Sequence, residues 1–286
     1  MSEANRLDGK VALVTGAGRG LGRAYALALA RAGARVVVND LGVQLDGSRP
    51  DGESAGAVVA EIRRGGGQAL ANTESVTDPA AVERMIEGTL ALFHRLDILV
   101  NNAGIVRSRP LAEMSLTEWQ AVLDVHLTGT FLCSRAAFRV MRDAGRGGRI
   151  INTTSGAAFA GPYPGSANYA AAKAGIIAMT RVVAVEGQPH GITCNAIAPL
   201  ARTRMSEQFL AGQNDSALEP EAVAPIIVYL ASDAAAAVSG VILRAARGEL
   251  STITTEAGSV FRSPSGQWTP EEVAAFIVQL ARPAPH

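Results

Sequence analysis

Short apolar runs alternate with longer alanine-rich stretches along most of this chain. The apolar runs, about four to seven residues long and rich in β-branched residues, predict buried strands, and the stretches between them have helical spacing. Continuous apolar strands separated by helices are typical of an α/β fold, a doubly wound parallel sheet with helices on both faces. The predicted strands are residues 11–14, 35–39, 68–73, 98–101, 149–153, 192–198 and 239–243, and the predicted helices are 21–32, 52–64, 79–93, 116–142, 168–186, 219–230 and 273–280.

The pattern weakens in two places. Residues 200–216 are polar and contain Gly and Asn, which predicts a mobile segment beside the site, and residues 244–268 indicate no clear element. Thr269, Pro270 and Glu272 have the order of an N-cap, a first helical residue and an acidic third residue. We expect one domain over residues 1–286, with a C-terminal extension at about 244–286.

Composition excludes several classes of protein. The formal net charge is zero, so nothing favours a nucleic acid or an anionic membrane surface as a partner. No apolar run approaches the roughly 20 residues of a membrane span, and the first ten residues contain no apolar signal segment. Cys133 and Cys194 both lie in apolar runs, and four scattered histidines predict no metal site. We expect a cytoplasmic protein.

The first predicted strand runs directly into TGAGRGLG at residues 15–22, which then opens a helix. Glycines let the backbone approach a pyrophosphate closely, and a helix N-terminus offers N–H donors to it. Gly16, Gly20 and Gly22 follow a TGxxxGxG spacing, with Arg19 and Leu21 between them. A tight turn is the alternative, but the strand before and the helix after favour a Rossmann-like dinucleotide site.

Asp40 ends the second strand, about 20 residues past the glycine-rich turn. A carboxylate there can accept both ribose hydroxyls of an adenosine and repels a 2′-phosphate, which favours NAD over NADP. Arg19 and Arg35 oppose this interpretation, because either could contact a phosphate. A simple turn aspartate before Leu41 is a further alternative.

The sequence NNAG follows the strand 98–101. Taken alone, two asparagines before Ala-Gly indicate nothing more than a turn. Beside a glycine-rich motif, the favoured interpretation makes Asn102, Ala103 and Gly104 a backbone wall next to the adenosine.

Ser155, Tyr169 and Lys173 form the constellation that carries chemistry. Tyr169 and Lys173 are four residues apart in a helical run and share one face. A phenol titrates near 10, and a nearby ammonium together with a positive nicotinamide ring would lower its pKa toward neutrality. Of 26 basic residues only Lys10 and Lys173 are lysines, so a lysine at this spacing favours catalysis over a packed helix-face pair.

TGAGRGLG, NNAG and YAAAK occur in order, and on these motifs the chain resembles the short-chain dehydrogenase/reductase family. Within it, VVVNDLG, VHLTGTF and CNAIAP are similar to the (3R)-hydroxyacyl-CoA dehydrogenase portion of the type-2 peroxisomal multifunctional enzyme. The resemblance implies a homodimer or homotetramer. It implies Tyr169 as acid and base, Lys173 on the ribose, Ser155 on the substrate oxygen, Asp40 on the adenosine ribose, Ser75 and Val76 at the adenine, and Pro199 through Thr203 at the nicotinamide carboxamide.

The chain departs from the family pattern twice. His126 stands where the family has an Asn whose helix opens to hold a relay water, so we expect the helix to open there. His126 then supplies a backbone carbonyl, joins the relay through its imidazole, or is only a packed histidine. Leu200 follows Pro199 where most members have glycine, so the path of the nicotinamide segment stays open.

The sequence thus predicts an NAD-dependent oxidoreductase acting on a secondary alcohol or ketone. A lipid-like substrate is expected, either a 3-hydroxyacyl thioester or a hydroxysteroid. Another small secondary alcohol and a catalytically idle NAD-binding regulatory protein are the alternatives.

Overall fold

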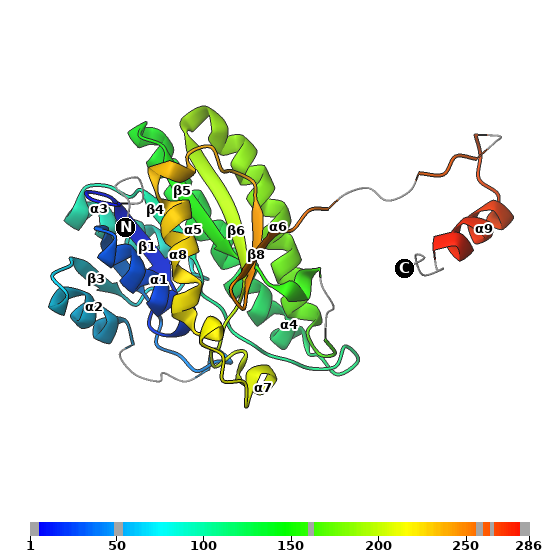
Figure 1. Cartoon of the computed structure of the whole chain (residues 1–286), viewed down its shortest axis with the longest axis horizontal. Coiled ribbons are helices and arrows are strands. Elements are labelled where there is room, and N and C mark those ends of the chain that lie inside the picture. The colour runs from blue at the N-terminus through cyan, green and yellow to red at the C-terminus, as the bar shows by residue number, and fades with distance from the viewer. Residues whose placement is uncertain (1–5, 49–53, 160–162, 256–259, 264–265, 281–286) are drawn as a thin grey trace. The chain divides into compact units, whose positions relative to one another are not determined.

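Eight strands within the described residues join in one sheet, in the order β3-β2-β1-β4-β5-β6-β7-β8 (Figure 1). All neighbouring pairs are parallel except β7 and β8, which are antiparallel. The computed structural model describes residues 6–48, 54–159, 163–255, 260–263 and 266–280. The strands are β1 (Val11–Thr15), β2 (Arg35–Asn39), β3 (Ala69–Asn72), β4 (Ile98–Asn101), β5 (Gly148–Thr153), β6 (Ile192–Leu200), β7 (Ile242–Ala246) and β8 (Glu249–Thr252).

Helices cover both faces of this sheet, as the apolar pattern predicted. Alternate residues of β2 divide between the two faces, since Val36 and Val38 pack on one core cluster and Val37 on the other. Helices α1, α2 and α8 contribute to the first cluster, and α3, α5 and α6 to the second. The expected doubly wound fold is confirmed. The α-helices of this part are α1 (Gly20–Arg31), α2 (Ser54–Arg64), α3 (Pro79–Phe93), α4 (Leu116–Leu123), α5 (Gly129–Ala144), α6 (Ala167–Gly187), α7 (Glu207–Leu210) and α8 (Ala224–Ala231).

The strand order reverses direction between β1 and β4. From β1 the chain moves outward through β2 and β3 and then returns to place β4 on the other side of β1. In open α/β sheets, ligands bind outside the carboxyl ends of the strands at such a reversal. Because Thr15 lies opposite Asn39 and Val14 opposite Val100, the loops after β1, β2 and β4 meet at this edge.

The predicted helix 116–142 was wrong as one continuous element. A π-helical turn, η2 (Asp124–Thr128), separates α4 from α5. At its end the N–H of Gly129 bonds the carbonyl of Asp124, five residues back instead of four. Hydrophobic spacing carries no sign of this change, but the expected opening at His126 coincides with it.

Further differences from the prediction include two element boundaries and one strand. The last predicted strand, 239–243, begins at Ile242, because Gly240 turns the chain at a φ of +79°. Helix α8 begins at Ala224 because Pro220 starts a separate 3-10 turn (Pro220–Ala222). The antiparallel strand β8 was not predicted.

Residues Thr254–His286 form a unit of their own, distinct from Met1–Ile253. It contains α9 (Pro270–Leu280). The predicted helix start is confirmed, because the N–H of Glu272 donates to Thr269 Oγ1 at 3.2 Å and the N–H of Thr269 donates to Glu272 Oε2 at 3.0 Å. No helix in the described parts of the chain is long and apolar enough to cross a membrane.

Candidate active site

The turn between β1 and α1 is pressed against the segment that follows β4. A Cβ on Gly16, whose φ is +62°, would lie 2.7 Å from the Cα of Ala103, and a Cβ on Gly22 would lie 2.2 Å from the carbonyl oxygen of Gly16. Side chains at either position would therefore force the backbones apart. Gly16, Arg19, Gly20 and Leu21 also line a pocket, so the N-terminus of α1 opens into it. Backbone N–H donors at a helix start suit a phosphate.

Asp40 fastens this turn to the end of β2. Its Oδ2 accepts the N–H of Gly18 at 2.8 Å and its Oδ1 accepts the N–H of Gly42 at 2.8 Å. The turn role and the ribose-binding role proposed from the sequence are therefore compatible, since each carboxylate oxygen has a second lone pair and Asp40 lines the pocket. Arg35 does not line it, because it opens β2 at the opposite end of the strand from Asp40.

The NNAG segment is locked to the end of β1. The N–H groups of Asn102 and Ala103 donate to Thr15 Oγ1 at 3.0 and 3.2 Å, and Asn102 Nδ2 donates to the carbonyl of Gly16 at 2.9 Å. Gly104 follows, and a Cβ there would lie 2.4 Å from His126 Cε1. The segment forms one wall of the pocket, and Ser75 and Val76, which follow β3, line it as well.

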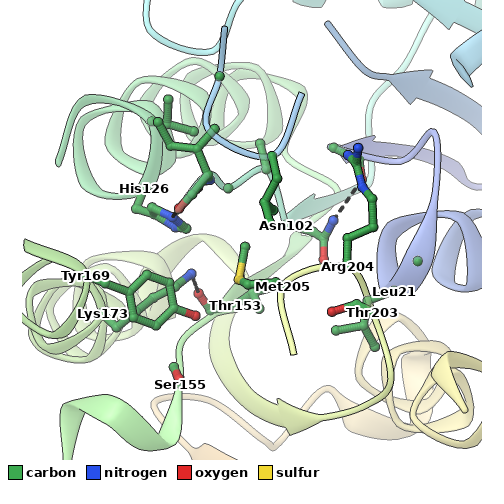
Figure 2. A pocket seen from close by; sticks show the side chains of 18 of the residues that line it. Leu21, Asn102, His126, Thr153, Ser155, Tyr169, Lys173, Thr203, Arg204 and Met205 are labelled. Atoms are coloured by element: carbon green, nitrogen blue, oxygen red, sulfur yellow. Dashed lines mark hydrogen bonds between the residues drawn. The ribbon is translucent and has the colours of Figure 1, made fainter. Parts of the chain in front are cut away.

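Ser155, Tyr169 and Lys173 meet in the same pocket, as Figure 2 shows. Ser155 follows β5, and Tyr169 lies in the first turn of α6, where the Ser155 hydroxyl is near enough to lower the pKa of its phenol. Lys173 Nζ lies 5.6 Å from the centre of the Tyr169 ring and donates to the carbonyl oxygen of Thr153 at 2.6 Å. The sequence did not identify Thr153, because its contribution is a backbone atom.

Burial dominates the electrostatics of this trio. It raises the pKa of Tyr169 to about 12, with a further rise from the nearby phenol of Tyr163, while the Ser155 hydrogen bond lowers it. It lowers the pKa of Lys173 to about 7. The sequence predicted a lowered pKa for Tyr169 beside an ammonium and a nicotinamide ring, whereas in this structure the largest effect is the desolvation of the phenolate, which raises that pKa.

His126 lies in the π-helical turn and is 1% exposed. Its Nε2 lies 2.8 Å from the carbonyl oxygen of Ile105 and 3.2 Å from the backbone nitrogen of the same residue, so Ile105 holds the ring through both of its backbone polar groups. Its Nδ1 has no hydrogen-bond partner among the described residues. Burial, and then the charge of Lys173, holds the pKa of His126 well below its usual range. The backbone carbonyl of His126 accepts the hydroxyl of Thr130 at 2.6 Å.

The segment after β6 crosses the glycine-rich turn. Leu200 is the last residue of β6 and pairs with Ala246, so this position needs no glycine conformation. Thr203 lies against Gly20, since a Cβ on Gly20 would come within 3.4 Å of its methyl group. Pro199 and Thr203 both line the pocket, as predicted. The sequence did not identify Met205, which lies across the pocket from Tyr169 (Figure 2).

All predicted site residues except Gly22 line this one pocket, whose volume is about 810 Å³. Gly22 instead lets α1 pack against the turn. Val43, Gln44, Leu45 and Gly47, which belong to none of the motifs, also line it. The carbonyl of Leu45 accepts the N–H of Val106 at 3.0 Å, and Arg107 Nε donates to the carbonyl of Asp46 at 2.8 Å. Their alternation of apolar and polar residues was the available signal.

Comparison with known proteins gives a consistent result. A family model described as short chain dehydrogenase matches residues 10–214. The peroxisomal multifunctional enzyme type 2 of Drosophila melanogaster is 48% identical over 225 residues, covering 79% of this chain and 37% of that protein. Hydroxyacyl-CoA dehydrogenase ChsB1 of Mycobacterium tuberculosis is 41% identical over 286 aligned residues, covering 95% of this chain and 88% of that one.

A solved structure agrees with these matches. A short chain dehydrogenase from Mycobacterium avium superimposes with a TM-score of 0.85 at 44% identity, covering 97% of each chain. The chain spans only about a third of the length of the multifunctional relatives that it matches.

Proposed function

Because the chain belongs to the short-chain dehydrogenase family, we propose that it is an NAD-dependent oxidoreductase that transfers hydride between nicotinamide and a secondary alcohol or ketone. The observation that carries the proposal is the convergence of Ser155, Tyr169 and Lys173 on the pocket that the glycine-rich turn also lines. The turn that suits a nucleotide and the side chains that can transfer a proton therefore line the same cavity.

The residues present fit a dinucleotide. Gly16 and Gly22 leave room where side chains would collide with backbone, and the start of α1 opens into the pocket. The turn and the N–H groups of α1 would hold the pyrophosphate, Asp40 the adenosine ribose and Lys173 the nicotinamide ribose. Nicotinamide, when bound, supplies the hydride acceptor or donor.

The chain's own residues handle the proton. Tyr169 takes the proton of the substrate hydroxyl during oxidation and returns it during reduction, while Ser155 donates a hydrogen bond to the substrate oxygen. Lys173 is held beside the Tyr169 ring by the Thr153 carbonyl, so its ammonium stabilises the phenolate once the site is occupied. Burial raises the pKa of this phenol to about 12, so the phenolate needs the positive charge of Lys173 and of the nicotinamide ring to form.

NAD is favoured over NADP by Asp40. Its carboxylate is held at the pocket by Gly18 and Gly42, where it would repel a 2′-phosphate. Arg19 is the pocket arginine that could oppose this preference, and Arg35 cannot, because it lies at the far end of β2.

A 3-hydroxyacyl thioester is the favoured substrate, with a hydroxysteroid as the second lipid-like candidate. Ile105, Leu200 and Met205 line the pocket and give it an apolar surface for an acyl chain or a ring system. The name of one relative described above, hydroxyacyl-CoA dehydrogenase ChsB1, supports the thioester. Another small secondary alcohol and an idle NAD-binding protein remain the competing hypotheses.

A cofactor-absorbance assay tests the proposal. The protein is supplied with NAD or NADP and with 3-hydroxyacyl-CoA of short and long chains, a hydroxysteroid, or small secondary alcohols. We expect NADH to form fastest with a 3-hydroxyacyl-CoA. Turnover of small alcohols alone would favour the second hypothesis, and NAD binding without turnover of any compound would favour the idle protein.

The cytoplasmic location and the homodimeric or homotetrameric state also stand as proposals, to be tested by cell fractionation and by light scattering on the purified protein. The single domain over residues 1–286, with its extension from about 244, is a proposal of the same kind, to be tested by limited proteolysis.

A further inference from the structure

Asn168 precedes Tyr169 in the first turn of α6, and both polar atoms of its side chain are hydrogen bonded. Its Nδ2 donates to the carbonyl of Arg107 at 2.9 Å and to the carbonyl of Glu118 at 3.3 Å. Its Oδ1 accepts the N–H of Tyr169 at 2.7 Å. The residue is 1% exposed, so these bonds form away from water.

The three bonds join three separate parts of the chain. Arg107 belongs to the segment that follows β4, Glu118 lies in α4, and Tyr169 lies in α6. The partners in the first two are backbone carbonyls, 61 and 50 residues away along the chain. Asn is well suited to this place, because its amide offers two N–H donors and one acceptor in a short side chain.

The start of α6 needs this acceptor. The first N–H groups of a helix have no partner inside the helix, and the N-cap residue Ser166 provides no side-chain hydrogen bond. Asn168 Oδ1 accepts the N–H of Tyr169, which the Ser166 side chain leaves without a partner. The backbone of Tyr169 is therefore fixed by the side chain of its neighbour.

The segment anchored by Asn168 also fixes the other neighbour of the Tyr169 ring. Ile105, two residues before Arg107, holds His126 Nε2, which lies 2.8 Å from its carbonyl oxygen and 3.2 Å from its backbone nitrogen. The His126 ring in turn lies edge-on to the Tyr169 ring. Segment 105–107 thus fixes the backbone of Tyr169 through Asn168. It also fixes His126, whose ring packs against the ring of Tyr169.

Lys173 has a different anchor. Its Nζ donates to the carbonyl of Thr153 at 2.6 Å, and its own carbonyl accepts the Thr154 hydroxyl at 2.8 Å. Thr153 is the last residue of β5 and Thr154 follows it, and neither is among the hydrogen-bond partners of Asn168 within the described residues. Loss of the Asn168 amide should loosen Tyr169 while leaving Lys173 on the sheet.

We propose that Asn168 is a positioning residue for the reaction, fixing Tyr169 relative to segment 105–107 without touching substrate or cofactor. The inference rests on the proposed function for its catalytic consequence. The anchoring of Tyr169 by Asn168 can be measured without any turnover, so the inference and the proposed function can fail separately.

The test compares Asn168→Ala with Asn195→Ala in the full chain. Asn195 is the matched control, because it is also fully buried and its amide bonds two backbone groups, the carbonyl of Val238 at 2.8 Å and the N–H of Val241 at 3.0 Å. It does not line the pocket. Asn168→Ser, which keeps a small polar group, takes the place of the alanine variant if that variant does not fold.

Two readouts separate anchoring from catalysis. Hydrogen exchange over residues 166–170 reports the anchor, with β5 as internal reference, and steady-state kinetics with NAD titration report its consequence. We expect Asn168→Ala to speed exchange at 166–170 only, and to lower kcat by about tenfold or more, since a misplacement near 1 Å can cost about 100-fold. NAD affinity should stay within about twofold, because Lys173 and the glycine-rich turn are unchanged. Asn195→Ala should lose thermal stability but keep kcat.

Several results would overturn the proposal. Unchanged exchange at 166–170 in Asn168→Ala would show that the amide is not the anchor. Faster exchange with kcat retained would leave Asn168 a structural residue only, and an equal loss of kcat in Asn195→Ala would make the effect a general one. If the wild-type protein turns over no alcohol or ketone, the proposed function fails, and the exchange result still decides whether Asn168 anchors Tyr169.

Discussion

The imidazole of His126 meets the phenol ring of Tyr169 edge-on, with ring centres 5.1 Å apart and planes at 89°. Burial and the charge of Lys173 keep that imidazole neutral, and Ile105 fixes its orientation. His126 therefore gives Tyr169 a fixed aromatic neighbour. It does not act as a second titrating group beside the phenol near neutral pH. The departure from the family pattern at this position replaces a small amide by a packed ring.

Tyr169→Phe should abolish turnover and leave NAD affinity nearly unchanged. The substitution removes only the phenolic oxygen and keeps the ring that packs on His126. General acid–base catalysis contributes about 10²- to 10⁴-fold, so kcat should fall by at least that much. The measurement is kcat together with NAD titration, and a variant that kept more than about a tenth of the wild-type kcat would contradict the assignment.

Asp40→Asn should narrow the preference for NAD over NADP. The wild-type ratio of kcat/KM should be at least about tenfold, equivalent to about 1.4 kcal/mol of charge repulsion. The melting temperature should also fall, because an amide cannot accept both the Gly18 and the Gly42 N–H groups.

Asp78→Asn is the matched control for Asp40. Asp78 also accepts a backbone N–H, that of Ala80 at 2.9 Å, and it does not line the pocket. Its replacement should leave the cofactor ratio unchanged. Equal use of both cofactors by the wild-type protein would contradict the role of Asp40 and point to Arg19 as a phosphate ligand.

His126→Asn should preserve the pH profile of kcat. A histidine whose pKa is held well below its usual range contributes no ionisation near 6 to 7, and asparagine offers the same backbone carbonyl in the π-helical turn. Some stability should be lost with the Ile105 contact. If the fold and NAD affinity are kept but kcat collapses and an ionisation disappears, the imidazole and not the carbonyl takes part in proton transfer.

Lys173→Met should gain stability relative to wild type as the pH falls, although it destroys activity. The pKa of Lys173 is about 7 when folded and 10.5 in the reference state, so between these values the unfolded chain holds a proton that the folded protein has released. Wild-type stability due to this group therefore rises with pH across that window. The variant lacks the dependence.

Melting temperatures of both proteins at pH 6 and pH 9 check this expectation. The difference between variant and wild type should be more favourable to the variant at pH 6, where the wild-type protein must bury an ammonium. Loss of the hydrogen bond to Thr153 lowers the melting temperature of the variant at both pH values, so this effect cancels when the two pH values are compared. A difference independent of pH would show that Lys173 keeps an ordinary pKa.

The sheet and the chemical triad could be predicted because their signals are local. The strands 35–39 and 98–101 were predicted at their observed bounds, since continuous apolar runs between polar residues leave little choice. Strand β8 has the sequence ELST and is exposed along its length, so it carries no apolar signal. Its existence depends on pairing with β7.

The hydrogen bonds that complete the site could not be predicted from residue types. The carbonyl of Thr153 receives Lys173, and the carbonyls of Arg107 and Glu118 receive Asn168. Every residue has such a carbonyl, and only the folded backbone decides which of them a distant side chain reaches. The break at residues 124–128 was expected from a family pattern and not from spacing.

The π-helical turn also has a consequence for insertions and deletions. Its bonds close over five residues instead of four, so it is an α-helical turn carrying one residue more. Because the wide turn absorbs that residue, the residues of α5 keep the face that a continuous helix without it would give them. Removing one residue from Asp124–Thr128 would therefore turn this stretch into regular helix and leave Leu132, Cys133 and Met141 directed at the sheet. If the extra residue were kept but the wide turn closed into an α-helical one, α5 would rotate by about 100° and those side chains would leave the core. A single-codon deletion there would thus disturb the surroundings of His126 before it disturbed the core.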